Sequence, residues 1–272
     1  MKRKLGNILI GMIFVLGIAC LLYPSVSDWW NRLHQSYAVA SYMEMVDQES
    51  ADYTGLKEAA EEYNSKLVND LNRWTFTDKE SAEYERLLSA TENGILGCIE
   101  IPQIDVSLPI YHGTEESVLQ IAVGHMKGSS LPIGGESTHS VLSAHTGLPS
   151  AKLFTDIDQL EVGDYFMLRI LDETLTYEVD RIAVVEPKEM EYLAIEEGKD
   201  YCTLLTCTPY GINTHRLLVR GHRVENRKEL VEAMEDRSGE MFGNLIKIGI
   251  LVVAAATTII VVVVVRKRRN AK

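Results

Sequence analysis

The sequence predicts a mainly β protein, in which a β-rich body follows a helical lead-in and an uncharged span lies near each end of the chain. Residues 5–23 and 248–265 are almost wholly apolar and are long enough to cross a bilayer as helices. Residues 29–90 contain no proline and are rich in Ala, Glu, Lys and Leu, a composition typical of helices. From Gly94 onward, short β-branched runs alternate with Gly and Pro, which predicts a sandwich or a barrel.

Residues 1–23 are interpreted as a membrane anchor or a signal peptide. A basic cluster, Lys2-Arg3-Lys4, precedes the apolar run, as it does in both kinds of segment. The run is longer than the core of a usual signal peptide, and no clear Ala-x-Ala cleavage site follows it. We therefore expect an uncleaved transmembrane helix, with a cleaved signal as the alternative.

The other end of the chain predicts a second transmembrane helix at residues 248–265. A linker at 226–247 joins it to the body, and a basic tail at 266–272 follows it. Basic clusters that flank membrane spans stay in the cytoplasm. We therefore expect a protein of the cell membrane with both termini cytoplasmic and the body on the extracellular face. Cleavage of the first span would leave the body on the same side.

The charge distribution fits this topology. All 39 Asp and Glu residues, but only 18 of the 27 Lys and Arg residues, lie between positions 24 and 246. An acidic exterior argues against binding to nucleic acid and against docking on anionic lipid. A solvated acidic surface is the simpler interpretation, and a basic protein partner is the alternative.

Residues 24–93 form the helical lead-in, and residues 94–225 form one β domain of ordinary size. In the lead-in, apolar side chains recur at helical spacing at Leu56, Ala59, Ala60, Tyr63, Leu67 and Leu71. A second short helix is expected at 81–88. The strands expected in the β domain include residues 98–101, 106–110, 140–144, 165–170 and 176–179.

The four cysteines do not form a disulfide framework. Cys20 lies in the first span, and Cys98 lies in a strand-like run that favours a core position. Cys202 and Cys207 are five residues apart, so in an extended segment their Cα atoms are about 16 Å apart and their side chains face opposite ways. A disulfide needs Cα atoms within about 7 Å. An unpaired thiol outside the cell is unusual enough to indicate chemistry.

Cys207 is the expected nucleophile. It closes the run Thr203–Cys207, and a turn at residues 208–211 leads into a second strand that contains Arg216. An antiparallel pair of this kind brings Cys207 and Arg216 side by side. A guanidinium beside a thiol favours the thiolate and can stabilise an oxyanion. His215 would face the opposite way. The alternatives are a small core cysteine and a surface arginine.

A cysteine nucleophile usually has a histidine partner. His145 follows the apolar strand expected at residues 140–144 and begins a loop, a position typical of site residues held by a rigid element. Among the other candidates, His34 follows the first span and is expected at the membrane interface or exposed. Turns, loops or strand ends are expected for the rest: His112, His125, His139 and His222. We therefore favour His145 as the partner of Cys207.

Thr-Leu-x-Thr-Cys followed nine residues later by Arg resembles the signature of the sortases, membrane-anchored transpeptidases of Gram-positive bacteria. Further segments match in order and spacing: residues 101–113, 124–132, 144–149, 148–156 and 208–216. The last two segments and the second apolar span resemble class C, the pilus-assembling branch. The resemblance is dense from residue 80 to 225.

The resemblance implies an eight-stranded β-barrel with a groove that ends at Cys207. It implies that Cys207 attacks the threonine carbonyl of an LPXTG-like sorting signal and forms a thioester. It implies that His145 protonates the departing amine and later accepts a proton from the incoming amine, while Arg216 stabilises the oxyanion. The implied partners are pilins or other surface proteins with C-terminal sorting signals, and the class C acceptor is a pilin lysine. This chemistry needs no metal or organic cofactor.

One departure from class C concerns the lid that covers the cysteine. That class usually carries an Asp-Pro-aromatic motif before the barrel, but this chain has no proline between Pro24 and Pro102. Trp74 and Phe76 take the place of the motif, and Trp74 stands where the acidic residue would be. We therefore predict an apolar lid without a salt bridge to Arg216. The alternative is an aromatic pair that packs on the core.

Two other functions stay open at this point. The first is a sortase that attaches proteins to the cell wall, with a peptidoglycan-precursor amine as the acceptor. The second is a non-catalytic scaffold that binds pilins. The joint presence of Cys207, His145 and Arg216 favours an enzyme.

Overall fold

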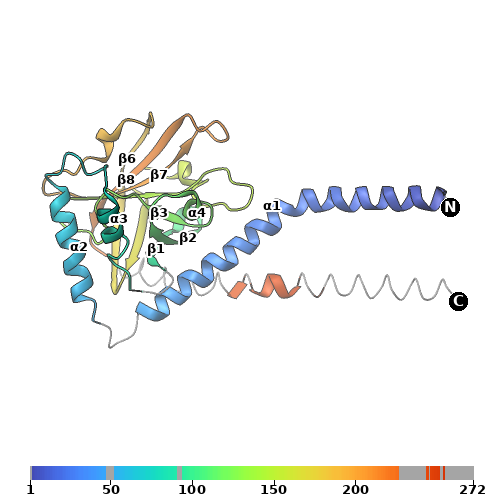
Figure 1. Ribbon diagram of the computed structural model, residues 1–272, viewed down its shortest axis with the longest axis horizontal. Coiled ribbons are helices and arrows are strands. Elements are labelled where there is room, and N and C mark those ends of the chain that lie inside the picture. Colours follow the sequence, from blue (N-terminus) through green and yellow to red (C-terminus); the bar gives the residue numbers. More distant parts are fainter. Residues whose placement is uncertain are drawn as a thin grey trace.

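Eight strands close into a barrel, which confirms the mainly β fold and the strand number expected from the sequence (Figure 1). The strands are β1 (Ile95–Ile101), β2 (Val106–His112), β3 (Val123–His125), β4 (Thr138–Ser143), β5 (Tyr165–Ile170), β6 (Glu173–Val185), β7 (Asp200–Thr208) and β8 (His215–Val224). Their order around the barrel is β1-β2-β3-β4-β7-β8-β6-β5. The β2/β3 and β4/β7 pairs are parallel, and the other pairs are antiparallel.

The computed structural model describes residues 2–46, 52–90, 94–226, 243–244, 246–251 and 254. Most of the expected linker (226–247), most of the C-terminal span (248–265) and all of the basic tail (266–272) lie outside the described residues. Within the described part, one helix is long and apolar enough to cross a membrane, and it begins near the N-terminus.

The strands differ from the sequence-based expectation mainly in length. β5 has the expected bounds, whereas β6 runs six residues past the expected end at position 179. β3 was not expected as a strand, because three residues are too few to show an alternating pattern. It holds His125, which was expected in a loop, and His139 likewise lies inside β4.

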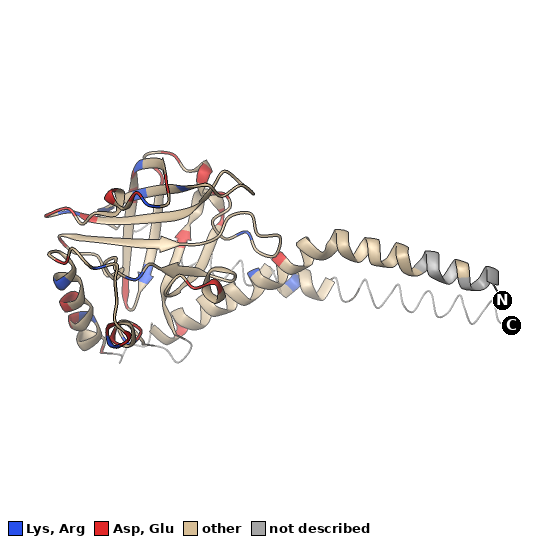
Figure 2. Cartoon of the chain, turned by 45° about the horizontal axis from the view of Figure 1, so that its top comes forward, with Lys and Arg blue, Asp and Glu red and all other residues tan. Residues whose placement is uncertain are grey.

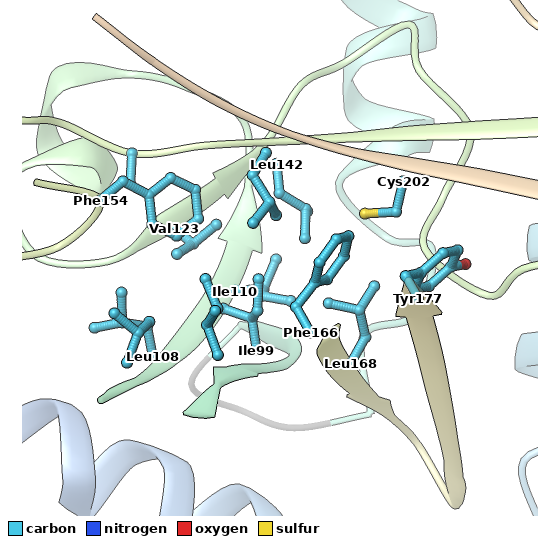
Figure 3. Packing of buried hydrophobic residues seen from close by; sticks show 14 of the residues in the cluster. Ile99, Leu108, Ile110, Val123, Leu142, Phe154, Phe166, Leu168, Tyr177 and Cys202 are labelled. Atoms are coloured by element: carbon cyan, nitrogen blue, oxygen red, sulfur yellow. The ribbon is translucent and has the colours of Figure 1, made fainter. Parts of the chain in front are cut away.

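Alternate residues of the strands fill the barrel with apolar side chains (Figure 3). Phe166 and Tyr177 stack with ring centroids 5.4 Å apart. Gly221 leaves room for this stack, since a Cβ there would lie 2.7 Å from Cε1 of Phe166. Cys202 is fully buried in this core and Cys98 is buried in a second cluster under α1. Burial raises the pKa of both thiols, so neither is a reactive thiolate.

Helix α1 (Lys2–Val46) is a single element that Pro24 does not interrupt. Its first half projects from the body and carries no charged residue between positions 12 and 27 (Figure 2). Its second half packs against β1 and β2, where Val39, Tyr42 and Val46 are buried. The Tyr42 hydroxyl donates to the Leu96 carbonyl at 3.0 Å and accepts from the Leu171 amide at 2.7 Å. The expected boundary near residue 24 is therefore not a break in the helix.

Two helices follow in the lead-in, α2 (Thr54–Leu67) and α3 (Asp78–Tyr84). The expectation that the helical spacing continues to Leu71 is wrong. Leu71 lies beyond α2, and its side chain is 96% exposed. α3 begins and ends earlier than the expected 81–88. A capping box, in which Thr77 and Glu80 bond to each other's backbone amides, fixes its first turn.

The remaining elements are short. They are α4 (Glu116–Leu119) and the 3-10 turns η1 (Pro102–Ile104), η2 (Ile157–Gln159) and η3 (Met190–Leu193). α4 lies in the connection between β2 and β3, and η3 lies in the connection between β6 and β7. Both connections border the functional residues described below.

Asn64 attaches α2 to the barrel. Its side-chain amide donates to the Leu131 carbonyl at 3.1 Å, and its oxygen accepts from the Leu131 amide at 2.7 Å. We expect Asn64→Ala to lower the free energy of unfolding by about 2 kcal/mol or more, because two buried backbone groups lose their partner. Ser65→Ala is the control, since Ser65 is exposed and bonds only within α2. Equal unfolding midpoints in urea for the two variants would contradict this role.

Candidate active site

The structure places the three expected site residues at the ends of three neighbouring strands. Cys207 on β7 lies directly opposite Arg216 on β8 in the antiparallel register. β4 runs parallel to β7 with Ser143 opposite Leu205. His145 lies two residues beyond the end of β4. The Ala144 amide continues the pairing with β7 by donating to the Leu205 carbonyl, which brings His145 level with Cys207; paired strands are about 4.8 Å apart. His145, Cys207 and Arg216 therefore lie side by side although they are far apart in the sequence.

Cys207 and Arg216 belong to the outer face of the barrel. Leu204 of β7 and Val219 of β8 are paired in the register and are buried in the interior core. Because side chains alternate along a strand, Leu205, Cys207, Arg216 and Leu218 point outward. Leu205 and Leu218 join a separate apolar cluster on that outer face. This alternation explains why Cys202 is fully buried whereas Cys207 is partly accessible.

The threonines of the Thr203–Cys207 run hold β7 against β4. Thr206 donates its hydroxyl to the Ala144 carbonyl at 2.7 Å, and the Ala144 amide donates to the Leu205 carbonyl at 3.2 Å. Thr203 is buried, and its hydroxyl lies 2.7 Å from Nε2 of His139. Thr206 and Ala144 directly precede Cys207 and His145. The bond between them therefore fixes how the two site residues are spaced.

The His145 ring contacts a carboxylate that the sequence did not single out. Its Nε2 lies 3.2 Å from Oε2 of Glu116, on α4. Hydrogen bonds from Gln120 and then from His145 lower the pKa of Glu116, so this carboxylate is ionised at neutral pH. An ionised carboxylate only accepts hydrogen bonds, so Nε2 is the ring nitrogen that donates to Glu116. No sequence pattern links positions 116 and 145, since a contact across 29 residues depends on the fold.

Two of the other histidines are structural. His125 and His139 are fully buried, and burial lowers the pKa of each to about 4. Both ring nitrogens of each are engaged: His125 with Tyr84, Ser129 and the Ser130 carbonyl, and His139 with Thr203 and the Ala194 carbonyl. A neutral, fully bonded histidine cannot exchange protons with a substrate.

The remaining histidines lie away from the outward face of Cys207. His34 lies on α1 with its ring tilted against Trp30, and His112 ends β2 beside Tyr84. His222 lies inside β8 and is opposite Tyr201, at the other end of the pair from Cys207. His215 is opposite Thr208, so it alternates to the other side of β8 from Arg216. Of the histidines considered, His145 is the one that the register brings level with Cys207.

Arg216 directs its guanidinium toward its own turn in this structure. Its Nη1 donates to the carbonyls of Asn213 and His215 at 3.2 and 3.0 Å. The turn between β7 and β8 has Gly211 and Asn213 in the left-handed region, with φ of 73° and 60°. Both residue types adopt that conformation readily, which allows the short reversal that brings Arg216 opposite Cys207.

The two expected lid aromatics occupy different environments. Trp74 packs against the outer-face cluster formed by Val141, Val185, Leu193, Leu205 and Leu218. Phe76 lies under the Lys127 ammonium, with 4.8 Å between the nitrogen and the ring centroid, and lines a hollow between α2 and α3. Trp74 is therefore the lid candidate that lies on the same face as Cys207.

Arg73 attaches the segment that carries Trp74 to two neighbouring parts of the body. Its guanidinium is buried and donates to the Gly128 carbonyl at 3.1 Å and to the Leu193 carbonyl at 2.7 Å. It also lies 4.4 Å from the Trp74 ring centroid. A Cβ at Gly128 would lie 2.3 Å from the Arg73 carbonyl oxygen, so glycine is required for this approach. The segment thus bridges the β3–β4 connection and η3.

Among the residues that the structure describes, no group of three or more His, Cys, Asp and Glu side chains is arranged to hold a metal ion. A cavity of about 320 Å³ lies between α2 and the β3–β4 and β5–β6 connections, lined by residues such as Asn64, Gly134 and Glu173. Neither Cys207 nor His145 lines it.

Comparisons with known proteins agree with this geometry. The family described as Sortase domain matches residues 99–224. The crystal structure of sortase C1 from Streptococcus agalactiae is 50% identical with a TM-score of 0.67, covering 70% of this chain and 100% of that one. The structure described as sortase C1 of GBS pilus island 1 is 42% identical with a TM-score of 0.65, covering 71% and 94%.

A curated relative gives a match of lower identity. Sortase D of Bacillus subtilis (strain 168) is 32% identical over 131 residues, which are 47% of this chain. The matched region spans 63% of the length of that relative. The chain therefore matches less than two thirds of the length of that relative.

The hydrogen bond from Thr206 to the Ala144 carbonyl is expected to contribute to stability. Thr206→Val keeps the shape of the side chain but leaves a buried carbonyl without its donor, so we expect the free energy of unfolding to fall by about 1–3 kcal/mol. Thr206→Ser restores the hydroxyl and should recover most of that loss. Urea unfolding measures both variants, and a serine variant as unstable as the valine variant would contradict this assignment.

Proposed function

Because the chain belongs to the sortase family, we propose that it is a cysteine transpeptidase that cleaves an LPXTG-like sorting signal through a thioester on Cys207. The observation that carries the proposal is the register of three strands, which sets His145 and Arg216 on either side of Cys207. The outward direction of Cys207 supports it as well, since a peptide can approach the barrel from that face.

The proposed first half-reaction forms the thioester. The Cys207 thiolate attacks the threonine carbonyl carbon, and the carbonyl oxygen becomes an oxyanion. Arg216 turns from its own loop carbonyls to donate to that oxygen, a contribution typically worth about 10²–10³ in rate. Protonated His145 donates its proton to the glycine nitrogen as the C–N bond breaks. Glu116 holds Nε2, so Nδ1 is the nitrogen that exchanges protons.

The proposed second half-reaction joins the acyl group to an amine. The amine attacks the thioester carbonyl, His145 accepts its proton, and the C–S bond breaks to return the Cys207 thiolate. An isopeptide or peptide bond replaces the one that was broken, so the sequence needs no oxidant, reductant or metal. Glu116 would stabilise the imidazolium that each half-reaction requires.

The acceptor we propose is the side-chain amine of a pilin lysine, so that the enzyme polymerises pili. The 50% identity to a sortase of the C type and the similarity to an enzyme described by its pilus island support this choice. The proposed donors are pilins or other surface proteins with C-terminal sorting signals. A peptidoglycan-precursor amine is the alternative acceptor.

We also propose that α1 anchors the enzyme in the cell membrane with the barrel on the extracellular side. The apolar first half of α1, the family's association with membranes and the acidic body support this placement. The second span and the cytoplasmic position of both termini stay predictions.

The enzyme hypothesis predicts a covalent intermediate. Incubating the purified full-length protein with a sorting-signal peptide should add the mass of the acyl fragment to Cys207, and with a purified pilin it should give a ladder of covalent oligomers. Cys207→Ala should abolish both products. His145→Ala and Arg216→Ala should slow acylation at least about 100-fold.

Intact mass spectrometry and gel electrophoresis read the two products. Cys202→Ala is the matched control, because this buried thiol is remote from the outer face. Acylation without a pilin ladder would favour the cell-wall acceptor. If no acyl-enzyme forms on the wild-type protein, the result favours a non-catalytic scaffold that binds pilins.

We propose further that the segment around Trp74 is an apolar lid. Trp74 covers the outer-face cluster that continues from Leu205 toward Cys207, about 7 Å away along the strand. A sorting peptide that reaches Cys207 along this face would have to displace the indole. Arg73 would hold the lid through carbonyl groups, in place of a salt bridge to Arg216.

Removing the lid aromatic should therefore open the site. We expect Trp74→Ala to raise the rates of Cys207 alkylation and of sorting-peptide hydrolysis several-fold, since the apolar cover is lost. Phe76→Ala should change both rates less, because Phe76 lies beside Lys127 on the α2–α3 side. Iodoacetamide kinetics measure the first rate. Unchanged alkylation in Trp74→Ala would rule out a lid at this position.

A further inference from the structure

One face of α1 carries a row of polar side chains that bond to the barrel. Asp28, Asn31 and Gln35 recur at intervals of three and four residues, so they lie along one side of the helix. The row begins five residues after Tyr23, where the apolar run of α1 ends. Each of the three side chains bonds to a backbone group of a loop rather than to another side chain.

Asp28 and Asn31 hold the loop that begins with His145. Asn31 donates its side-chain amide to the Ser150 carbonyl at 2.8 Å, and Asp28 accepts from the Lys152 amide at 3.1 Å. The base of the same loop is closed by the Phe154 amide, which donates to the His145 carbonyl at 3.1 Å. Because Phe154 is fully buried, the loop is fixed to the core at its base and to α1 at its tip.

Gln35 holds the connection that carries Glu116. It is buried and donates its side-chain amide to the Ile121 carbonyl at 2.8 Å. Ile121 ends the turn that starts with α4, through the bond from its amide to the Val118 carbonyl at 3.0 Å. At the other end of α4, Glu116 meets Nε2 of His145. The backbone and the ring of His145 are thus each connected to α1 through a short segment.

We propose that the Asp28–Gln35 face of α1 is a positioning element of the active site, which sets the distance between Glu116 and His145 and the direction of the His145 ring. This inference rests on the proposed function for its catalytic consequence, though the contacts themselves do not. A shift of about 1 Å in a catalytic group can cost about 100-fold in rate. The two loops that meet at the contact of Glu116 with His145 are both held by one helix.

The same contacts place the active-site loops close to the bilayer. Five helical residues between Tyr23 and Asp28 correspond to about 8 Å along the axis. The tip of the His145 loop therefore lies next to the expected membrane surface, on the side where α1 leaves the body (Figure 1).

The test uses full-length protein in lipid nanodiscs and two single variants, Asn31→Ala and Gln35→Ala. We expect each to lower kcat for peptide transpeptidation about tenfold with little change in KM, because the outer face around Cys207 is untouched while His145 is misplaced. Hydrogen exchange should rise at residues 146–153 in Asn31→Ala and at residues 117–122 in Gln35→Ala.

Tyr42→Phe is the matched control. Tyr42 lies on the same helix and makes the same kind of bonds to backbone groups, but at the opposite end, against Leu96 and Leu171. It should lower the Tm and leave kcat unchanged. Asn31→Ala and Gln35→Ala variants that lower only the Tm, as Tyr42→Phe does, would overturn the inference.

Hydrogen exchange tests the positioning role even if the proposed function is refuted. A wild-type protein without transpeptidase activity would refute the proposed function alone, and hydrogen exchange would then decide the positioning role. Local loss of protection confined to the two loops supports it. Exchange that is unchanged, or that rises uniformly over the barrel, overturns it.

Discussion

The parallel pairing of β4 with β7 is the constraint on which the rest of the site depends. It sets His145 level with Cys207, although 62 positions separate them in the chain. The Thr206 hydroxyl, bonded to the Ala144 carbonyl, fixes this pairing at the strand ends, where a ladder would otherwise fray. The antiparallel β8 then adds Arg216 on the other side. A one-residue slip in either pair would turn a functional side chain to the opposite face.

The same three strands serve two apolar environments. Their inward residues, such as Leu142 and Leu204, belong to the barrel core, and their outward residues, such as Val141 and Leu205, form the cluster under Trp74. Cys202 and Cys207 are five residues apart in β7. This odd spacing puts the Cys202 thiol in the interior and the Cys207 thiol on the outer face. Burial makes the Cys202 thiol inert, whereas the Cys207 thiol borders the outer surface, where we propose that a peptide or a lid lies.

Elements outside the barrel are attached mainly through bonds from side chains to backbone groups. Arg73 holds the segment that carries Trp74 through two carbonyls. Asn64 holds α2 through Leu131, and Asn31 and Gln35 hold two loops against α1. Such bonds fix a loop without demanding a particular side chain from it. The conformation of the active-site loops therefore depends on helices that contribute no reacting group.

The sequence by itself determined the β-rich body, the apolar first span, the core position of Cys98 and Cys202, and the candidates Cys207, Arg216 and His145. These follow from local patterns, namely alternation, composition and a short strand–turn–strand unit, or from motifs in a matching order. Only the tertiary structure decided the remaining features. They are the three-residue β3, the continuation of α1 through Pro24, the end of α2 before Leu71, the contact of Glu116 with His145 and the separate surroundings of Trp74 and Phe76. Each of these depends on which segments meet in space, and that is a property of strand order and helix docking that no local pattern contains.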